Sequence, residues 1–211
     1  MKKLMLGLMI AFAVTEVGAG VVPGVIIDGL EYSLDTEAKT AAITGYTDEP
    51  TEVRVETVYK DGVIYTVTSV EQFAFYCCSS LTSVYLPKVT LIGNHAFGSC
   101  ASLVTVFLPA VITIKEVAFR DCPLASVSLP AAIVIAESAF YGCSKLSSAF
   151  LPNATSIGVQ AFYECTSLTT VVMPYVDKIA EKTFVACPLT SISLPNATLP
   201  TYGALVYCAA A

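Results

Sequence analysis

The sequence is poor in the residues that catalysis and nucleic-acid binding require. It contains one histidine, His95, among 211 residues, so a Ser-His-Asp or Cys-His site would have to be built on that residue. No G-x-S-x-G motif and no glycine-rich phosphate loop is present. Charged residues make up 13% of the chain, and no basic cluster offsets the net charge of −6. We therefore predict a protein that is not an enzyme, uses no cofactor or metal, and does not bind nucleic acid, whose phosphates require basic side chains.

The chain also lacks, beyond its first residues, an apolar run of the roughly 20 residues that span a bilayer. Lys2 and Lys3 precede an apolar run of 11 residues, Leu4 to Val14, and small residues follow at 18–20. We interpret residues 1–19 as a secretory signal peptide. The alternative is a buried N-terminal helix. Secretion predicts a protein that is released or held at the cell surface.

The segment 20–68 shows strand patterns without a repeat. Asp28-Gly29 and Asp61-Gly62 each separate two β-rich runs, which is typical of a hairpin turn. Residues 41–46 favour a strand, and residues 51–58 alternate polar and apolar side chains as a half-exposed strand does. We predict that this segment is a β-rich N-terminal cap on a solenoid, because an uncovered end would expose the core.

From residue 69 to residue 211 the chain is built from repeats. A phenylalanine recurs with steps of 22, 22, 21, 22 and 22 residues, a cysteine follows it by three residues, and a proline closes each unit. The phenylalanines are Phe75, Phe97, Phe119, Phe140, Phe162 and Phe184. Six full repeats of 21–22 residues precede a degenerate seventh, with Leu205 in the phenylalanine position and Cys208 in register. A period of this length is typical of solenoids.

Each repeat combines two patterns. The L-x-x-V-x-L part, such as Leu81 to Leu86, alternates as a short strand with Val84 and Leu86 pointing inward. We expect these strands to pair in parallel as one continuous sheet, and the I-x-x-x-A-F part to form a short helical or 3-10 turn on the opposite wall with its phenylalanine inside. The third and sixth repeats lack one residue beside Pro123 and Pro188, and we place this deletion in a loop because a slip within a strand would turn its side chains over.

The unit I-x-x-x-A-F-x-x-C-x-x-L-x-x-V-x-L-P resembles the repeat of the BspA-like leucine-rich-repeat surface proteins. The resemblance runs from Val70 to Cys208, and the preceding segment resembles the cap of such proteins. It implies an α/β leucine-rich-repeat solenoid: a right-handed superhelix with parallel strands on one face, helical or 3-10 turns opposite, and an N-terminal β-hairpin cap. Family members are secreted or surface-displayed and are implicated in adhesion to host or neighbouring cells. The resemblance suggests binding and supplies no catalytic residues.

The cysteines invite a disulfide or zinc interpretation, because an even number in a secreted chain is typical of disulfides. Seven of the 8, however, form one column with one cysteine per coil, which predicts buried free thiols. Cys77 lies outside the column and is expected to be exposed, and no paired C-x-x-C motifs point to zinc. We interpret His95, Asp121 and Glu164 as solvated surface residues.

The outward positions of the predicted strands form an uncharged stripe. Exposed aromatic and apolar patches mark interaction sites, and solenoids bind through such surfaces. The predicted binding face consists of Tyr85, Phe107, Phe150, Val172, Ser83, Thr105, Ser148 and Thr170. The alternatives are that these are ordinary strand residues on a solvated sheet, or that they contact a neighbouring part of a larger protein or assembly.

The patterns and the family resemblance together suggest two functions. The first is adhesion, in which the face binds a protein or glycan ligand on host or neighbouring cells. The second is a structural surface or coat module that self-associates end to end through an uncapped C-terminal coil.

Overall fold

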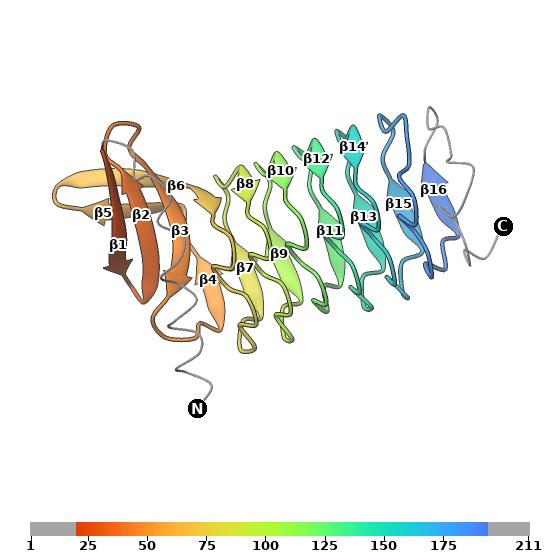
Figure 1. Ribbon diagram of the computed structural model, residues 1–211, viewed down its shortest axis with the longest axis horizontal. Helices are drawn as coiled ribbons and strands as arrows, with labels where there is room; N and C mark the ends of the chain where they lie inside the picture. The colour runs from red at the N-terminus through yellow and green to blue at the C-terminus, as the bar shows by residue number, and fades with distance from the viewer. Residues whose placement is uncertain (1–19, 194–211) are drawn as a thin grey trace.

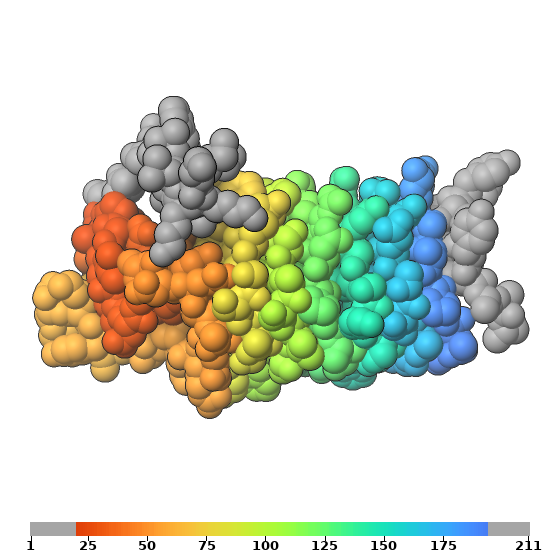
Figure 2. Space-filling model, turned by 90° about the horizontal axis from the view of Figure 1, so that it is seen from below, coloured from red at the N-terminus to blue at the C-terminus, as the bar shows by residue number. Residues whose placement is uncertain are grey.

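The computed structural model describes residues 20–193 and shows an elongated stack of coils with a β-rich end (Figure 1). Figure 2 shows the coils as successive bands along the long axis. Within the described residues every regular element is a strand. The predicted signal peptide and the seventh repeat lie outside the described residues.

The N-terminal strands include both predicted hairpins. Asp28-Gly29 and Asp61-Gly62 connect β1 to β2 and β5 to β6, and all four residues have positive φ, as a two-residue hairpin turn requires. The strands are β1 (Val21–Ile27), β2 (Leu30–Asp35), β3 (Thr40–Tyr46), β4 (Glu52–Arg54), β5 (Thr57–Lys60) and β6 (Val63–Val70). The single strand predicted over 51–58 is wrong: it is divided into β4 and β5, because β4 pairs with β7 while β5 pairs with β6 in a different sheet.

The repeats contribute two strands to most coils. The predicted strands are β7 (Ser83–Tyr85), β9 (Thr105–Phe107), β11 (Ser126–Ser128), β13 (Ser148–Phe150), β15 (Thr170–Val172) and β16 (Ser191–Ser193). Together with β4 they form what we call the strand wall. A second set of two-residue strands contains the β-branched residue that lies five before each phenylalanine: β8 (Leu91–Ile92), β10 (Thr113–Ile114), β12 (Val134–Ile135) and β14 (Ser156–Ile157).

The described strands form three sheets. Nine strands form the largest, in the order β1-β2-β3-β6-β8-β10-β12-β14 with β5 beside β6. The strand wall consists of a three-stranded sheet, β4-β7-β9, and a four-stranded sheet, β11-β13-β15-β16. The expectation of one continuous sheet is therefore wrong between β9 and β11. A bond from Ala125 N to Val104 O (3.1 Å) still joins these coils. At the break Val106 is only partly buried, whereas Val84 and Val127 at the equivalent positions are buried.

The shortened repeats confirm the loop deletion. Cys122 and Leu124 are both buried on either side of Pro123, and β11 keeps residue-for-residue register with β13. β16 likewise keeps its register with β15 after Pro188. The missing residue is therefore absorbed before each strand begins.

The opposite wall, which we call the turn wall, consists of successive β-turns. Helical or 3-10 turns were expected there and are not confirmed, since the described residues contain only hydrogen-bonded turns in these segments. In the first coil, Ala74 N donates to Glu71 O (3.3 Å) and Cys78 N donates to Phe75 O (3.0 Å). The residues two before and two after each phenylalanine have positive φ, as at Phe73 (60°) and Cys77 (58°).

This backbone conformation directs amides toward the next coil. Phe73 N donates to Asn94 O (3.0 Å), Phe75 N to Ala96 O (2.8 Å) and Cys77 N to Gly98 O (2.9 Å). The same three bonds recur at every interface from the first coil to the sixth. A helix would direct these N–H groups along its own axis, whereas the turns use them to join neighbouring coils.

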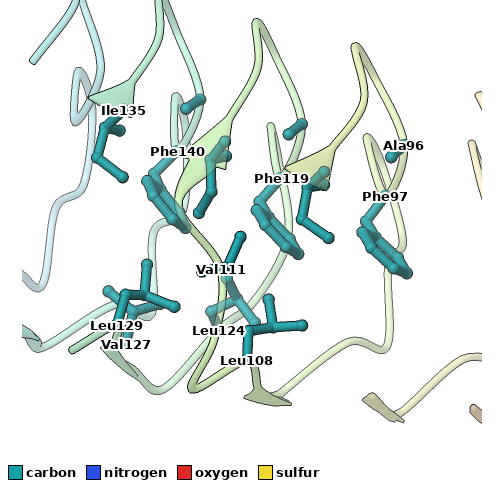
Figure 3. Close-up of a cluster of buried hydrophobic side chains, with 14 of the residues drawn as sticks. Ala96, Phe97, Leu108, Val111, Phe119, Leu124, Val127, Leu129, Ile135 and Phe140 are labelled. Atoms are coloured by element: carbon teal, nitrogen blue, oxygen red, sulfur yellow. The ribbon is translucent and has the colours of Figure 1, made fainter. Parts of the chain in front are cut away.

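The phenylalanines fill the interior between the walls. All six are fully buried, and successive rings stack in parallel with centroids 5.1 to 5.6 Å apart. Figure 3 shows Phe97, Phe119 and Phe140 in this column, with Leu108, Leu124 and Leu129, which flank β9 and β11, opposite them. Tyr46 stacks on Phe75 at 5.8 Å, so the column begins in β3. Burial of each ring contributes about 1.5–3 kcal/mol.

Candidate binding faces

The outward side chains of the strand wall lie where alternation places them. Val84 is buried in β7, and its neighbours Ser83 and Tyr85 point to the other side of the strand. Phe107 and Phe150 are 45% and 46% exposed, so their rings protrude from the coil. The remaining predicted face residues are exposed or half-buried on the same side: Val172, Thr105, Ser148 and Thr170.

Parallel pairing brings Tyr85 and Phe107 together. Their rings stack with centroids 4.7 Å apart and planes 6° from parallel. Arg54 of β4 completes this group, because its register opposite Tyr85 places the guanidinium carbon 4.0 Å from the ring centroid. A cation over a tyrosine ring is stabilised by the ring quadrupole.

Sequence reasoning missed Arg54. The alternation of residues 51–58 already places Val53 inward and Arg54 outward, and this signal could have found it. What the pattern lacks is the pairing of β4 with β7, since residues 51–54 precede the repeats.

The predicted face is divided in two. Tyr85 and Phe107 belong to the three-stranded sheet, whereas Phe150 and Val172 belong to the four-stranded sheet beyond the break. Ser128 occupies the equivalent position between the two phenylalanines. From β7 to β16 the strands of this wall carry no charged side chain, so Arg54 and Glu52 of β4 supply the strand charge at one end.

The cysteine column is structural. Cys78 and its five described equivalents are buried free thiols, as predicted, and Cys77 is exposed. Each buried S–H from the second coil onward points to a phenylalanine carbonyl of the preceding coil, as Cys143 Sγ does to Phe119 O (3.1 Å). Burial raises the pKa of the Cys143 thiol to about 12, which keeps the donor proton in place at neutral pH.

No metal-binding group appears among the described residues, where no cluster of three or more His, Cys, Asp or Glu side chains could hold an ion. Between residues 20 and 193 there is likewise no helix with the length and hydropathy needed to cross a membrane. The expected end-to-end association rests on the C-terminal coil, which lies outside the described residues.

His95 differs from its prediction as a solvated residue. It is half-buried, and its ring stacks on Phe73 with centroids 4.9 Å apart. Asp121 and Glu164 are exposed, as expected, although Asp121 accepts a hydrogen bond from Arg120 at 3.2 Å. The turn wall therefore carries aromatic contacts that the repeat pattern did not indicate.

The coils, the buried phenylalanine column and the inward leucines define a leucine-rich-repeat solenoid. Residues 68–190 and 133–208 match the model of the BspA type leucine rich repeat region, with 6 copies. The chain belongs to the BspA-type leucine-rich-repeat family. This confirms the resemblance that the repeat unit indicated.

Solved structures support the same conclusion. A leucine-rich repeat protein of T. pallidum is 31% identical, with a TM-score of 0.73 over 80% of this chain and 81% of that one. A leucine rich cell surface protein of Faecalibacterium prausnitzii is 27% identical, with a TM-score of 0.57 over 81% of this chain and 42% of that one. A leucine-rich repeat protein of Bacteroides ovatus, 18% identical with a TM-score of 0.55 over 78% of this chain and 57% of that one, shares the fold. Among proteins with curated functions, none matches this chain.

Proposed function

We propose that this protein is a secreted or cell-surface adhesion module that binds a protein or glycan ligand through its strand wall, without catalysis. One observation carries the proposal: Arg54, Tyr85 and Phe107 form an exposed stack on a wall that is otherwise uncharged from β7 to β16. Aromatic and arginine side chains dominate the energy of protein interfaces. The similarity to a cell surface protein supports the location.

We also propose that residues 20–68 are an N-terminal cap that covers the first coil of the solenoid. Tyr46 stacks on Phe75, and Tyr32, Leu34 and Ile43 belong to the same hydrophobic cluster as the coils. Without these side chains the first coil would expose its apolar interior to water.

The test is a binding screen with the full chain against arrayed host matrix proteins and glycans. For any ligand found, a double variant, Tyr85→Ser with Phe107→Ser, should weaken binding by about ten-fold or more, since truncation of central aromatic residues costs more than about 1.4 kcal/mol. Tyr59→Ser is the matched control, because Tyr59 is 66% exposed on β5, away from this wall. Circular dichroism establishes that each variant is folded. Equal binding by the double variant and the wild type would refute the assignment to the strand wall.

A further inference from the structure

The turn wall carries a second exposed surface that is richer in aromatic rings than the strand wall. Two columns contribute to it: the residue after each buried phenylalanine, and the residue two before it. We call it the turn-wall aromatic surface, and its members are Phe73, Tyr76, His95, Arg120, Tyr141 and Tyr163.

Its first part lies on the first two coils. Phe73 stacks on His95 at 4.9 Å, and Tyr76 meets both rings edge-on at 5.7 and 5.9 Å. Gly98 leaves room for this arrangement, since a Cβ there would stand 3.1 Å from a carbon of the Tyr76 ring. Phe73 and Tyr76 remain 52% and 38% exposed, so the cluster is packed on the wall and still open to solvent.

Its second part continues along the following coils. The Arg120 guanidinium lies 4.6 Å from the centroid of the Tyr141 ring, and Tyr141 stacks on Tyr163 at 5.0 Å. Asp121 pairs with the same guanidinium at 3.2 Å. Arg120 is thus held by a tyrosine ring and a carboxylate together.

Carboxylates flank the surface on both sides. Exposed acidic side chains occur three residues before the buried phenylalanine in three coils, and two residues after it in two coils: Glu116, Glu137, Glu181, Asp121 and Glu164. Glu71 adds another at the first coil, and within the described coils Lys115 and Lys182 join Arg120 as basic side chains close to these positions. A net negative field therefore surrounds the aromatic rings.

We propose that the turn-wall aromatic surface binds a cationic polypeptide segment, one rich in lysine or arginine. Tyrosine rings attract cations over their faces, and carboxylates pair with them electrostatically. Arg120 shows the arrangement within the chain, between Tyr141 and Asp121. Tyr163, which stacks on Tyr141, and the adjacent exposed Glu164 supply a further ring and carboxylate for a partner. The same wall of a second copy does not fit, because two acidic walls would repel each other.

This surface is separate from the strand wall, so it goes beyond the proposed adhesion site. The test uses the full chain and a short synthetic peptide of alternating arginine and glycine, with citrulline in place of arginine as the neutral counterpart. Binding is measured by calorimetry at low and at raised salt. The arginine peptide should bind at least about ten-fold more tightly than the citrulline peptide, and raised salt should weaken its binding.

Variants decide whether the ring and carboxylate act as proposed. Tyr163→Leu keeps much of the apolar area but removes the ring, and Glu164→Gln removes the charge. Each should weaken binding of the arginine peptide about five-fold. Glu37→Gln removes an exposed carboxylate from the N-terminal segment and should leave binding unchanged.

Three results would overturn the proposal. An equal loss in Glu37→Gln would show attraction to net charge alone. Equal binding of the citrulline peptide would show that the cation is not recognised. Loss in the Tyr85→Ser, Phe107→Ser double variant with no loss in Tyr163→Leu would place the peptide on the strand wall. Because that double variant should retain peptide binding here, failure of this proposal and failure of the adhesion proposal give different results.

Discussion

Phe140→Ala tests the buried aromatic column at a position inside the stack. The Phe140 ring is fully buried and stacks at 5.4 Å on Phe119 and at 5.3 Å on Phe162. Removing it leaves a cavity between two coils. The cavity cannot close easily, because the bond from Phe140 N to Ala161 O (2.8 Å) and its equivalents hold the coils at their spacing.

The expected loss of unfolding free energy is about 3–5 kcal/mol. Burial of the ring accounts for about 1.5–3 kcal/mol of this, and each of the two ring pairs adds about 0.5–1.5 kcal/mol. With a urea dependence of about 2 kcal/mol per molar, the unfolding midpoint should fall by roughly 1.5–2.5 M. A loss of this size is a large fraction of the roughly 5–15 kcal/mol that stabilises a typical domain.

The assay is urea unfolding followed by far-ultraviolet circular dichroism. Phe150→Ala is the matched control, because it is the same chemical change at a side chain that is 46% exposed on the strand wall. It should cost less than about 1 kcal/mol, in line with the small effects of surface substitutions. If both variants shifted the midpoint equally, the reasoning from a continuous buried column would be wrong.

Two further predictions concern coil spacing and pH. Gly158→Ala should lower the free energy of unfolding by about 1–3 kcal/mol, measured by thermal unfolding. The added Cβ would lie 2.5 Å from Glu137 N, a backbone atom that cannot move aside. Gly98→Ala should cost less, because the nearest neighbour of its Cβ is the movable Tyr76 side chain at 3.1 Å. Burial raises the pKa of the Cys143 thiol from 9.0 to about 12. As pH rises above about 9, the unfolded chain therefore loses this proton before the folded chain does. The free energy of unfolding should then fall by up to about 1.4 kcal/mol per pH unit. Urea midpoints measured across this range should fall less steeply in Cys143→Ala, and an unchanged slope would contradict the assignment.

The repeats and their inward positions were predictable because each rests on a local pattern. Phenylalanine spacing fixed the column, and the Asp28-Gly29 turn has the positive φ that its residue types favour. The turn wall was not predictable in the same way. Its left-handed positions include Phe73 and Val117, neither of which favours positive φ, because the conformation is imposed by hydrogen bonds to the next coil.

The residues of the candidate surfaces likewise divide into those that a local pattern predicts and those that depend on contacts between coils. Tyr85 and Phe107 face outward by alternation alone, so the sequence was sufficient to find them. The position of Arg54 over Tyr85 depends on the pairing of β4 with β7, and β4 lies outside the repeats. The contact of His95 with Phe73 depends on these two residue types in two neighbouring coils, and other coils carry different residues at the same position. The consensus of the repeats therefore does not predict contacts that occur at only one pair of coils.

The hydrogen bonds that join the β-turns of neighbouring coils run in one direction along the solenoid, with the amide of each coil donating to a carbonyl of the next. Each peptide group has a dipole of about 3.5 D, and aligned dipoles add, as they do in an α-helix. The strand ladders contribute little, since their dipoles alternate. The turn wall therefore gives the molecule a permanent axial polarity, with carbonyl oxygens facing the N-terminal segment and amide hydrogens facing the C-terminal direction. In an α-helix the amide hydrogens face the N-terminus and the carbonyl oxygens face the C-terminus, so the polarity of the turn wall is the reverse of that of a helix.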